Sequence, residues 1–482
     1  MKQIESKLSS SKAFFYILLL GILLRLFFVF FGGKIYYGKA DYFTQGDTPT
    51  WFYSFVNLVN SGTYTIDPAT DNAKFFRPPG YSFLFGIFYL LTFKNYILAS
   101  KLLVVLQVLM DIFSIWLVQQ ISFLSLREKN ERKKTIFGNS AAFLFAVYPF
   151  VIVWAPVLYA ETSSLFFLLL SVFFSMKLIS NKNSLISGIF GGIATLIRLQ
   201  CIFALPILCF AFLFQKTDVK KKIKVMAFFG FGVMITYGLW PARNYFLHNR
   251  IVFSQDLNIG NFWSKDYMAF MDYVYAVRTD HYPVYQSLIH GEKVNWPEAS
   301  YMNKRDSILL DSVSKLCNTC GTGFSYFMVN EGMRAQTIDP ATNCDSSIAS
   351  IFNELKAEQK KNNALHYWLT VPLGNLQKCF FKFSLYGNKS SIVKLLSSML
   401  FIFRTLFIFL GFYGIYLGIK NKFFSMGFSF FILSYPIVWY LYLSFFYRNM
   451  EMRYLLHTDV LLLIPAAFVF ASLIFNKYQK AT

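Results

Sequence analysis

Long apolar runs alternate with short polar segments along most of this 482-residue chain. Most of these runs have the length and the low charge that a membrane-spanning helix requires. We predict about ten spans, at residues 13–33, 97–124, 138–154, 162–180, 183–200, 201–215, 223–241, 394–419, 423–446 and 455–475. The pattern therefore predicts an all-α polytopic integral membrane protein.

Lysines and arginines orient these spans. Lys2, Lys7 and Lys12 precede the first apolar run, and the basic cluster REKNERKK follows the second. Because basic loops stay in the cytoplasm, we predict that the N-terminus and this cluster lie inside and that loop 34–96 lies outside. The proline-led run at residues 78–93 is short for a crossing, so we expect an interfacial or re-entrant helix. The first run lacks a small-residue cleavage site and is predicted to be a retained anchor.

The composition agrees with this class. The chain is 55% hydrophobic and 20% aromatic, with a mean hydropathy of +0.44, which is more apolar surface than one soluble core buries. Its formal net charge is +21, but the basic residues collect in short loops, as expected beside an anionic leaflet. We therefore expect membrane lipid, and not nucleic acid, to be the partner of this charge.

The polar stretch 41–81 has helical periodicity. Its apolar residues recur at three- and four-residue steps, at Trp51, Phe52, Phe55, Leu58 and Val59. This spacing predicts an amphipathic helix that lies in the interface with its apolar face in lipid. Asp47 opens the helix. It is interpreted either as an N-cap or as a carboxylate held near the headgroups, where it acts on a lipid-borne substrate.

Three regions are expected along the chain. Residues 1–243 form a transmembrane catalytic module that includes the first outer loop, residues 244–393 form an external segment, and residues 394–482 form C-terminal transmembrane helices. The external segment is polar and long enough to fold as a small insert.

The external segment holds most of the cysteines. They are Cys317, Cys320, Cys344 and Cys379. Only CNTC has the spacing of a zinc-ligand pair, so we favour a disulfide formed in an oxidising compartment. Its pairing, a zinc site and free thiols remain open alternatives.

Charged residues gather at the predicted outer face. They are two acids and four arginines: Asp47, Glu161, Arg77, Arg198, Arg243 and Arg453. Ionisable groups near the membrane are costly and often mark function. The alternative is a set of surface or snorkelling side chains, especially for Arg198 and Arg453. Six such residues on one face favour a functional site.

Several motifs occur in order: GDTPTWFYSFVNLVNSGTYT with RPPGY, YAET, GGIATLIRLQ, WPARNYFLHNRIVFSQDLNIGNFW and RYLLH. This set resembles the GT-C class of polyprenyl-phosphate-sugar-dependent glycosyltransferases, in particular the branch of protein O-mannosyltransferases and lipid A aminoarabinose transferases. The resemblance covers most of the first 265 residues and returns near the C-terminus, whereas residues 266–394 match no family. It implies a GT-C-like helical bundle with interfacial helices in the first outer loop.

The resemblance also implies roles for the charged residues. Asp47 is expected to be the general base, Glu161 a second active-site carboxylate, and Arg77 of RPPGY a contact to the lipid phosphate. The other arginines are candidate donor-binding cations, because guanidinium groups bind phosphate oxygens in pairs. Thr48 stands where several relatives have a second acid, and His457 stands where a proline is common. The sequence leaves room for a divalent cation, but no ligand cluster supports one, so we predict no firm cofactor or metal.

Together these features predict a membrane glycosyltransferase that uses a lipid-phosphate hexosyl or pentosyl donor. The acceptor is expected to be a protein hydroxyl, lipid A or another glycan at the periplasmic face of a bacterial inner membrane, with inversion at the anomeric carbon. No nucleotide-binding glycine loop is present, and Gly191 and Gly192 are explained by helix packing. The alternatives are a transporter or flippase for lipid-linked sugars, which would have midplane charges and internal repeats, and a retained fold without catalysis.

Overall fold

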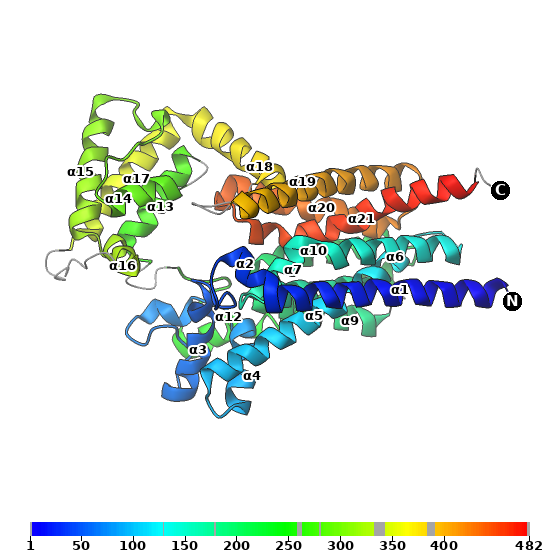
Figure 1. The fold of residues 1–482 in the computed structure, drawn as a ribbon. Helices are drawn as coiled ribbons and strands as arrows, with labels where there is room; N and C mark the ends of the chain where they lie inside the picture. The colour runs from blue at the N-terminus through cyan, green and yellow to red at the C-terminus, as the bar shows by residue number, and fades with distance from the viewer. Residues whose placement is uncertain are drawn as a thin grey trace.

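The computed structural model describes residues 2–128, 130–177, 180–257, 263–278, 281–331, 343–382 and 391–479 (Figure 1). Within these ranges helices are the only regular elements, apart from one isolated antiparallel bridge between Leu126 and Phe424. The all-α prediction is confirmed.

Five helices in the described ranges are long and apolar enough to cross a membrane. The first is Lys12–Tyr37, which joins α1 (Lys2–Phe27) to α2 (Gly33–Tyr37). The second and third are α5 (Tyr96–Ser125) and α19 (Ser391–Lys420). The last two are Met426–Tyr447, which contains α20 (Met426–Leu441), and Met452–Ser472 of α21 (Met452–Gln479). A sixth candidate is the pair α11 (Val219–Met234) and α12 (Leu239–His248), which is bent by 46°. The protein is therefore an integral membrane protein by the length and composition of its helices.

The remaining predicted spans coincide with shorter helices. These are α6 (Glu131–Val147), α7 (Pro149–Trp154), α8 (Ala160–Met176), α9 (Asn181–Ile197) and α10 (Ala204–Ala211). α6, α8 and α9 have 17 residues each. They fall just below the length of about 20 residues that spans a bilayer without thinning. The predicted count of about ten spans is not confirmed.

One hydrophobic core joins most of this bundle. Buried side chains of α5, α6, α8, α10, α19, α20 and α21 belong to a single cluster. α1 begins and α21 ends at the same end of the bundle (Figure 1). A Cβ on Gly192 would collide with Thr236, and one on Gly191 would collide with Leu205, so the packing interpretation of these glycines is confirmed.

The first outer loop contains α3 (Thr48–Ser61), a 3₁₀ turn (Asp71–Phe75) and α4 (Pro79–Leu91). Phe52 of α3 is fully buried and stacks on Phe85 of α4, with ring centroids 4.1 Å apart. Trp51 likewise packs edge-on against Tyr81. The expectation that this face of α3 lies in lipid is wrong, because α4 supplies an aromatic protein surface for it. α4 spans about 20 Å, less than a hydrocarbon core of about 30 Å.

The external segment builds a hydrophobic core of its own. Its helices are α13 (Lys265–Val277), α14 (Tyr282–Ile289), α15 (Lys304–Cys320), α16 (Thr322–Asn330) and α17 (Asp345–Asn362). α18 (Val371–Phe381) leads back toward the bundle (Figure 1). The predicted boundary at residue 393 falls just inside α19, and residues 383–390 before it lie outside those described.

A disulfide joins Cys320 at the end of α15 to Cys344 before α17, which confirms the disulfide prediction. Cys317 and Cys379 are free and buried. The zinc alternative is wrong, because two of its four cysteines are bonded to each other.

Candidate active site

Four helix ends meet where the bundle joins the outer loop. Asp47 directly precedes α3, Glu161 lies in the first turn of α8, Arg198 directly follows α9, and Arg453 lies in the first turn of α21. Three of these ends are helix N-termini, which carry partial positive charge and unpaired N–H groups. Such ends stabilise carboxylates and bind anions.

The outer loop is fixed to the bundle through the turn before α8. The backbone N–H of Asp47 donates to the hydroxyl of Tyr159 at 3.2 Å, and Thr48 Oγ1 donates to the carbonyl of Leu158 at 3.2 Å. The side chain of Asp47 makes no capping hydrogen bond. Asp47 thus occupies the N-cap position of α3 without capping the helix through its side chain, and its carboxylate is available for other contacts.

Arg453 stands among three carboxylates. Its Nη1 lies 2.8 Å from Asp47 Oδ2, and its Nε lies 2.6 Å from Glu451 Oε2 and 3.8 Å from Glu161 Oε1. Arg198 Nη1 lies 2.9 Å from the same Glu161 oxygen. We call these five residues, Asp47, Glu161, Arg198, Glu451 and Arg453, the outer charge cluster.

Exposure separates the carboxylates of the cluster. The side chains of Asp47 and Glu451 are 37% and 38% exposed, whereas that of Glu161 is 1% exposed. A substrate can therefore reach Asp47, while Glu161 lies behind the two arginines.

The pKa of Asp47 is set by opposing effects. Burial raises the pKa of this carboxyl, but the positive charges of Arg453 and Arg77 outweigh burial and hold the pKa below its ordinary value. Burial also raises the pKa of Glu451, and Arg453 again lowers it below its ordinary value. Asp47 is thus ionised at neutral pH, and it accepts a proton weakly as long as Arg453 stays beside it.

Arg77 adds a positive charge next to the cluster. Its Nη2 donates to Thr50 Oγ1 at 3.2 Å, and its guanidinium lies 4.1 Å from the ring centroid of Trp51. It makes no ion pair with any residue in the described part of the chain. This cation–π contact leaves its charge free to act on Asp47 and on a ligand.

Several buried polar atoms at the site are unsatisfied. Nε of Arg77, Nε of Arg198 and both carboxylate oxygens of Glu161 have no hydrogen-bond partner among the described residues. The contact of 2.9 Å between Arg198 and Glu161 is an ion pair without hydrogen-bond geometry. Because buried polar groups are normally paired, this spare capacity indicates a place for a polar ligand.

Arg243 is not brought into the cluster. Its Nη1 donates to the carbonyl of Lys74 at 3.0 Å and its Nη2 to the carbonyl of Tyr64 at 3.2 Å. It therefore ties the outer loop to α12, and its contact to a donor phosphate stays a prediction. The structure thus brings together Asp47, Glu161, Arg198 and Arg453, with Arg77 beside them.

Sequence reasoning missed Glu451, whose position two residues before Arg453 in a polar segment was an available signal. It also missed Tyr454, which donates to Glu451 Oε1 at 2.9 Å. His457, the departure from the family motif, is buried deeper in α21, where Nε2 lies 2.9 Å from Ser164 Oγ.

Arg453 supplies the positive charge between two carboxylates of the site. The guanidinium of Arg453 occupies the position between Asp47 and Glu161 where a cation would bind both. No group of three or more His, Cys, Asp or Glu side chains that would suit a metal ion occurs in the described ranges.

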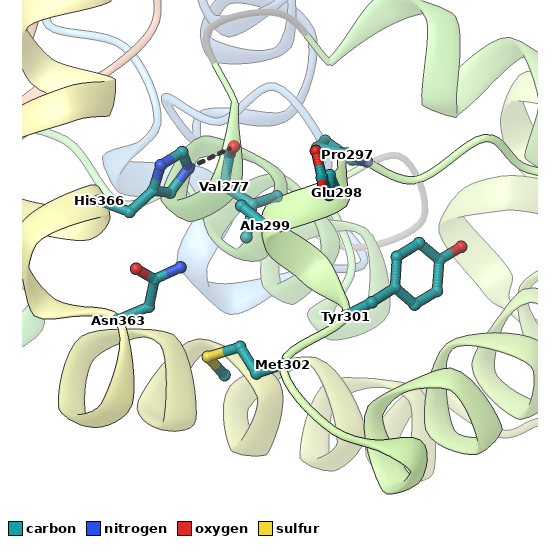
Figure 2. Close-up of a pocket in the computed structure, with 8 residues that line it drawn as sticks. All are labelled: Val277, Pro297, Glu298, Ala299, Tyr301, Met302, Asn363 and His366. Carbon is teal, nitrogen blue, oxygen red and sulfur yellow. Dashed lines mark hydrogen bonds between the residues drawn. The ribbon is translucent and has the colours of Figure 1, made fainter.

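Two cavities lie apart from the cluster. One, of about 600 Å³, lies in the external segment, where Figure 2 shows Glu298, Asn363 and His366 among its lining residues and His366 Nε2 lies 3.0 Å from the Val277 carbonyl. The other, of about 670 Å³, lies at the opposite end of the bundle.

Comparisons with known proteins support the fold. No protein-family model and no curated protein matches this chain. The oligosaccharyltransferase of Archaeoglobus fulgidus tethered with an acceptor peptide is similar in structure, with a TM-score of 0.52 and 13% identity over 96% of this chain. The same protein, AglB, in complex with an inhibitory peptide and a dolichol-phosphate, gives a TM-score of 0.50 and 13% identity, also over 96% of this chain. In both comparisons the match covers 50% of the archaeal chain, so this protein spans about half of its length.

ArnT from Cupriavidus metallidurans, bound to undecaprenyl phosphate, also matches, with a TM-score of 0.33 and 12% identity over 94% of this chain and 76% of that one. A TM-score this low does not support an argument about the fold of this chain. The archaeal comparison confirms the predicted GT-C-like helical fold, and this chain shares the fold of the half of the archaeal oligosaccharyltransferase that it matches.

Proposed function

We propose that this protein is a glycosyltransferase that transfers a sugar from a polyprenyl-phosphate-linked donor to an acceptor at the outer face of the membrane. One observation carries the proposal. Asp47, the exposed carboxylate at the start of α3, makes no capping bond and instead pairs with Arg453, while the nearby Arg77 and Arg198 each have an unsatisfied Nε. A reactive carboxylate beside cations suited to phosphate is what sugar transfer from a lipid phosphate requires.

In the proposed reaction the acceptor hydroxyl gives its proton to Asp47 and its oxygen bonds to the anomeric carbon. The bond from that carbon to the phosphate oxygen breaks, and the polyprenyl phosphate leaves with the electron pair. Arg453, Arg198 and Arg77 stabilise the charge on the leaving phosphate. Direct attack from the opposite face inverts the anomeric centre.

Donor binding also activates the base in this scheme. A phosphate that draws Arg453 toward itself weakens the ion pair of 2.8 Å with Asp47. The proton affinity of Asp47 then rises, because the charge that lowered its pKa has moved. Glu161, buried behind both arginines, holds them in place without touching the acceptor.

We further propose a bacterial inner membrane with this site on the periplasmic side, and a protein hydroxyl, lipid A or another glycan as acceptor. Acceptor choice is assigned to the external segment, whose cavity presents Tyr301, Asn363 and His366 (Figure 2). Aromatic and amide side chains of this kind suit a sugar or a peptide.

The test is a transfer assay with the full chain in proteoliposomes, a panel of hexosyl and pentosyl polyprenyl phosphates, and mixed protein and glycolipid acceptors. Mass spectrometry of the products identifies donor and acceptor together. We expect transfer from at least one lipid-linked donor and none from nucleotide sugars. Transfer from a nucleotide sugar alone, or movement of intact lipid-linked sugar across the membrane without transfer, would refute the proposal.

A further inference from the structure

A cavity lies at the end of the bundle opposite the outer charge cluster. The cavity of about 670 Å³ is formed by the ends of α5 and α8, the region around α10 and the start of α20. α8 begins at the cluster with Glu161 and reaches the cavity with Met176 and Lys177. At 1.5 Å per residue this helix separates the two sites by about 25 Å. The transfer reaction makes no use of this cavity.

The lining of the cavity is strongly basic. Arg127, Lys177 and Lys216 line it, and no acidic residue does. All three side chains are exposed, and none forms an ion pair with another residue that the structure describes. Three cations at one cavity without a counter-charge create a positive potential that attracts an anion.

Most of the rest of the lining is apolar. Val172, Leu208, Phe212 and Phe431 are buried walls of the cavity. The rim also carries apolar side chains that remain exposed, namely Leu124, Phe214 and Met426, of which Met426 is 54% exposed. A free anion gains nothing from such a rim, whereas a phospholipid presents a phosphate and acyl chains together.

One polar group in the cavity wall is unsatisfied. The buried side-chain oxygen of Gln215 has no hydrogen-bond partner within the described residues. Because a buried amide oxygen without a donor is costly, it favours a ligand that carries a hydroxyl as well as a phosphate. The glycerol headgroup of phosphatidylglycerol has both groups.

We propose that this cavity binds the headgroup of an anionic phospholipid, with Arg127, Lys177 and Lys216 around its phosphate and its acyl chains against the exposed apolar rim. Basic pockets between transmembrane helices are a recurrent form of lipid site. The bound lipid joins the ends of helices α5, α8 and α20. Because it binds only the folded bundle, it raises the stability of the protein.

The test uses the purified full chain in a neutral detergent, titrated with dioleoyl phosphatidylglycerol and followed by thermal unfolding and native mass spectrometry. We expect phosphatidylglycerol to bind and to raise the unfolding temperature, and dioleoyl phosphatidylcholine and inorganic phosphate to do neither. The triple variant Arg127→Gln, Lys177→Gln, Lys216→Gln should bind phosphatidylglycerol about a hundredfold more weakly, at about fivefold for each charge.

The matched control removes the same charge elsewhere on the same end of the bundle. Lys220→Gln, Lys221→Gln, Lys224→Gln alters three exposed residues of α11 that do not line the cavity, and it should keep wild-type affinity. The double variant Lys177→Arg, Lys216→Arg should also keep wild-type affinity for phosphatidylglycerol. Because this variant retains the positive charges, it distinguishes a loss of charge from a loss of fold.

Each other outcome overturns the proposal. Equal stabilisation by inorganic phosphate assigns the cavity to a soluble anion, and equal binding of phosphatidylcholine removes the role of the cations. Unchanged affinity of the lining variant, or equal loss in the α11 control, places the lipid elsewhere on the surface.

Discussion

The outer charge cluster and two buried ion pairs in the bundle are both built from arginines and carboxylates, but they differ in their exposure to solvent. Arg25 Nε lies 2.6 Å from Asp111, and Arg404 Nε lies 2.6 Å from Asp459. All four side chains are essentially inaccessible. In the cluster, Arg453 makes a contact of similar length to Glu451, but its acidic partners Asp47 and Glu451 are more than one third exposed.

None of the four inner side chains has a buried polar atom without a partner among the described residues. Arg404 donates to both carboxylate oxygens of Asp459 and to the carbonyls of Cys379 and Phe380, and Tyr148 donates to the same carboxylate at 3.1 Å. Arg25 likewise donates to Asp111 and to backbone carbonyls. The outer cluster retains unpaired atoms on Glu161 and Arg198. A charge at membrane depth therefore does not by itself indicate catalysis; exposure and unused bonding capacity distinguish the candidate site from structural pairs.

The largest expected effect comes from breaking an inner pair. Asp459→Asn leaves Arg404 buried without its counter-charge and should destabilise the protein by about 3–5 kcal/mol. Replacing both partners with apolar residues, Arg404→Met and Asp459→Leu, should restore most of the loss, because the buried charge is then gone. Thermal and denaturant unfolding in detergent measure both variants. A stable Asp459→Asn protein that has lost transfer activity would instead assign this pair to catalysis.

The next largest effect is expected at Asp47. Asp47→Asn keeps the size of the side chain and removes proton acceptance, so transfer should fall by about a hundredfold or more while unfolding is unchanged. The control is Asp71→Asn, which alters a 96% exposed carboxylate in the same outer loop and should leave transfer unchanged. Wild-type transfer by purified Asp47→Asn protein would show that Asp47 is not the base.

Arg453→Gln tests the electrostatic part of the comparison. Because the pKa of Asp47 lies below its ordinary value, the carboxylate stays ionised until the pH falls through that lowered value, and both its ion pair and its activity are lost only below it. Without Arg453 that pKa should rise, because burial then acts with less opposing positive charge. The acid limb of the pH–rate profile should therefore move to higher pH. This shift is measured separately from any fall in the maximum rate. An acid limb at the wild-type pH would mean that Asp47 does not control it.

The sequence was sufficient to find most of the outer cluster. Asp47, Glu161, Arg198 and Arg453 all follow from span ends, positive-inside orientation and the family motifs, which place them at one face of the bundle. Glu451 lies just before the RYLLH motif and belongs to no motif of its own. Which of these side chains is exposed depends on tertiary packing, and periodicity does not encode it.

The four residues of the inner pairs can be seen in the sequence as charges inside apolar runs. The sequence does not show which of these charges pair with each other. Arg25 and Asp111 are 86 residues apart and meet only because α1 packs on α5. The same limit applies to the disulfide, since four cysteines allow several pairings. It also explains the error over α3, whose apolar face was assigned to lipid although α4 covers it.

The smallest expected effect separates Arg77 from Arg243. Arg77→Lys keeps the charge but loses the planar stacking on Trp51 and the paired contact to phosphate, so transfer should fall by about tenfold with unfolding little changed. Arg243→Lys should instead lower the unfolding temperature and leave the rate per folded molecule unchanged, because Arg243 bonds the carbonyls of Lys74 and Tyr64. Single-turnover transfer measured beside thermal unfolding distinguishes the two. If Arg243→Lys lowers transfer without loss of stability, Arg243 belongs with the donor site, and the boundary of the outer cluster must be extended to α12.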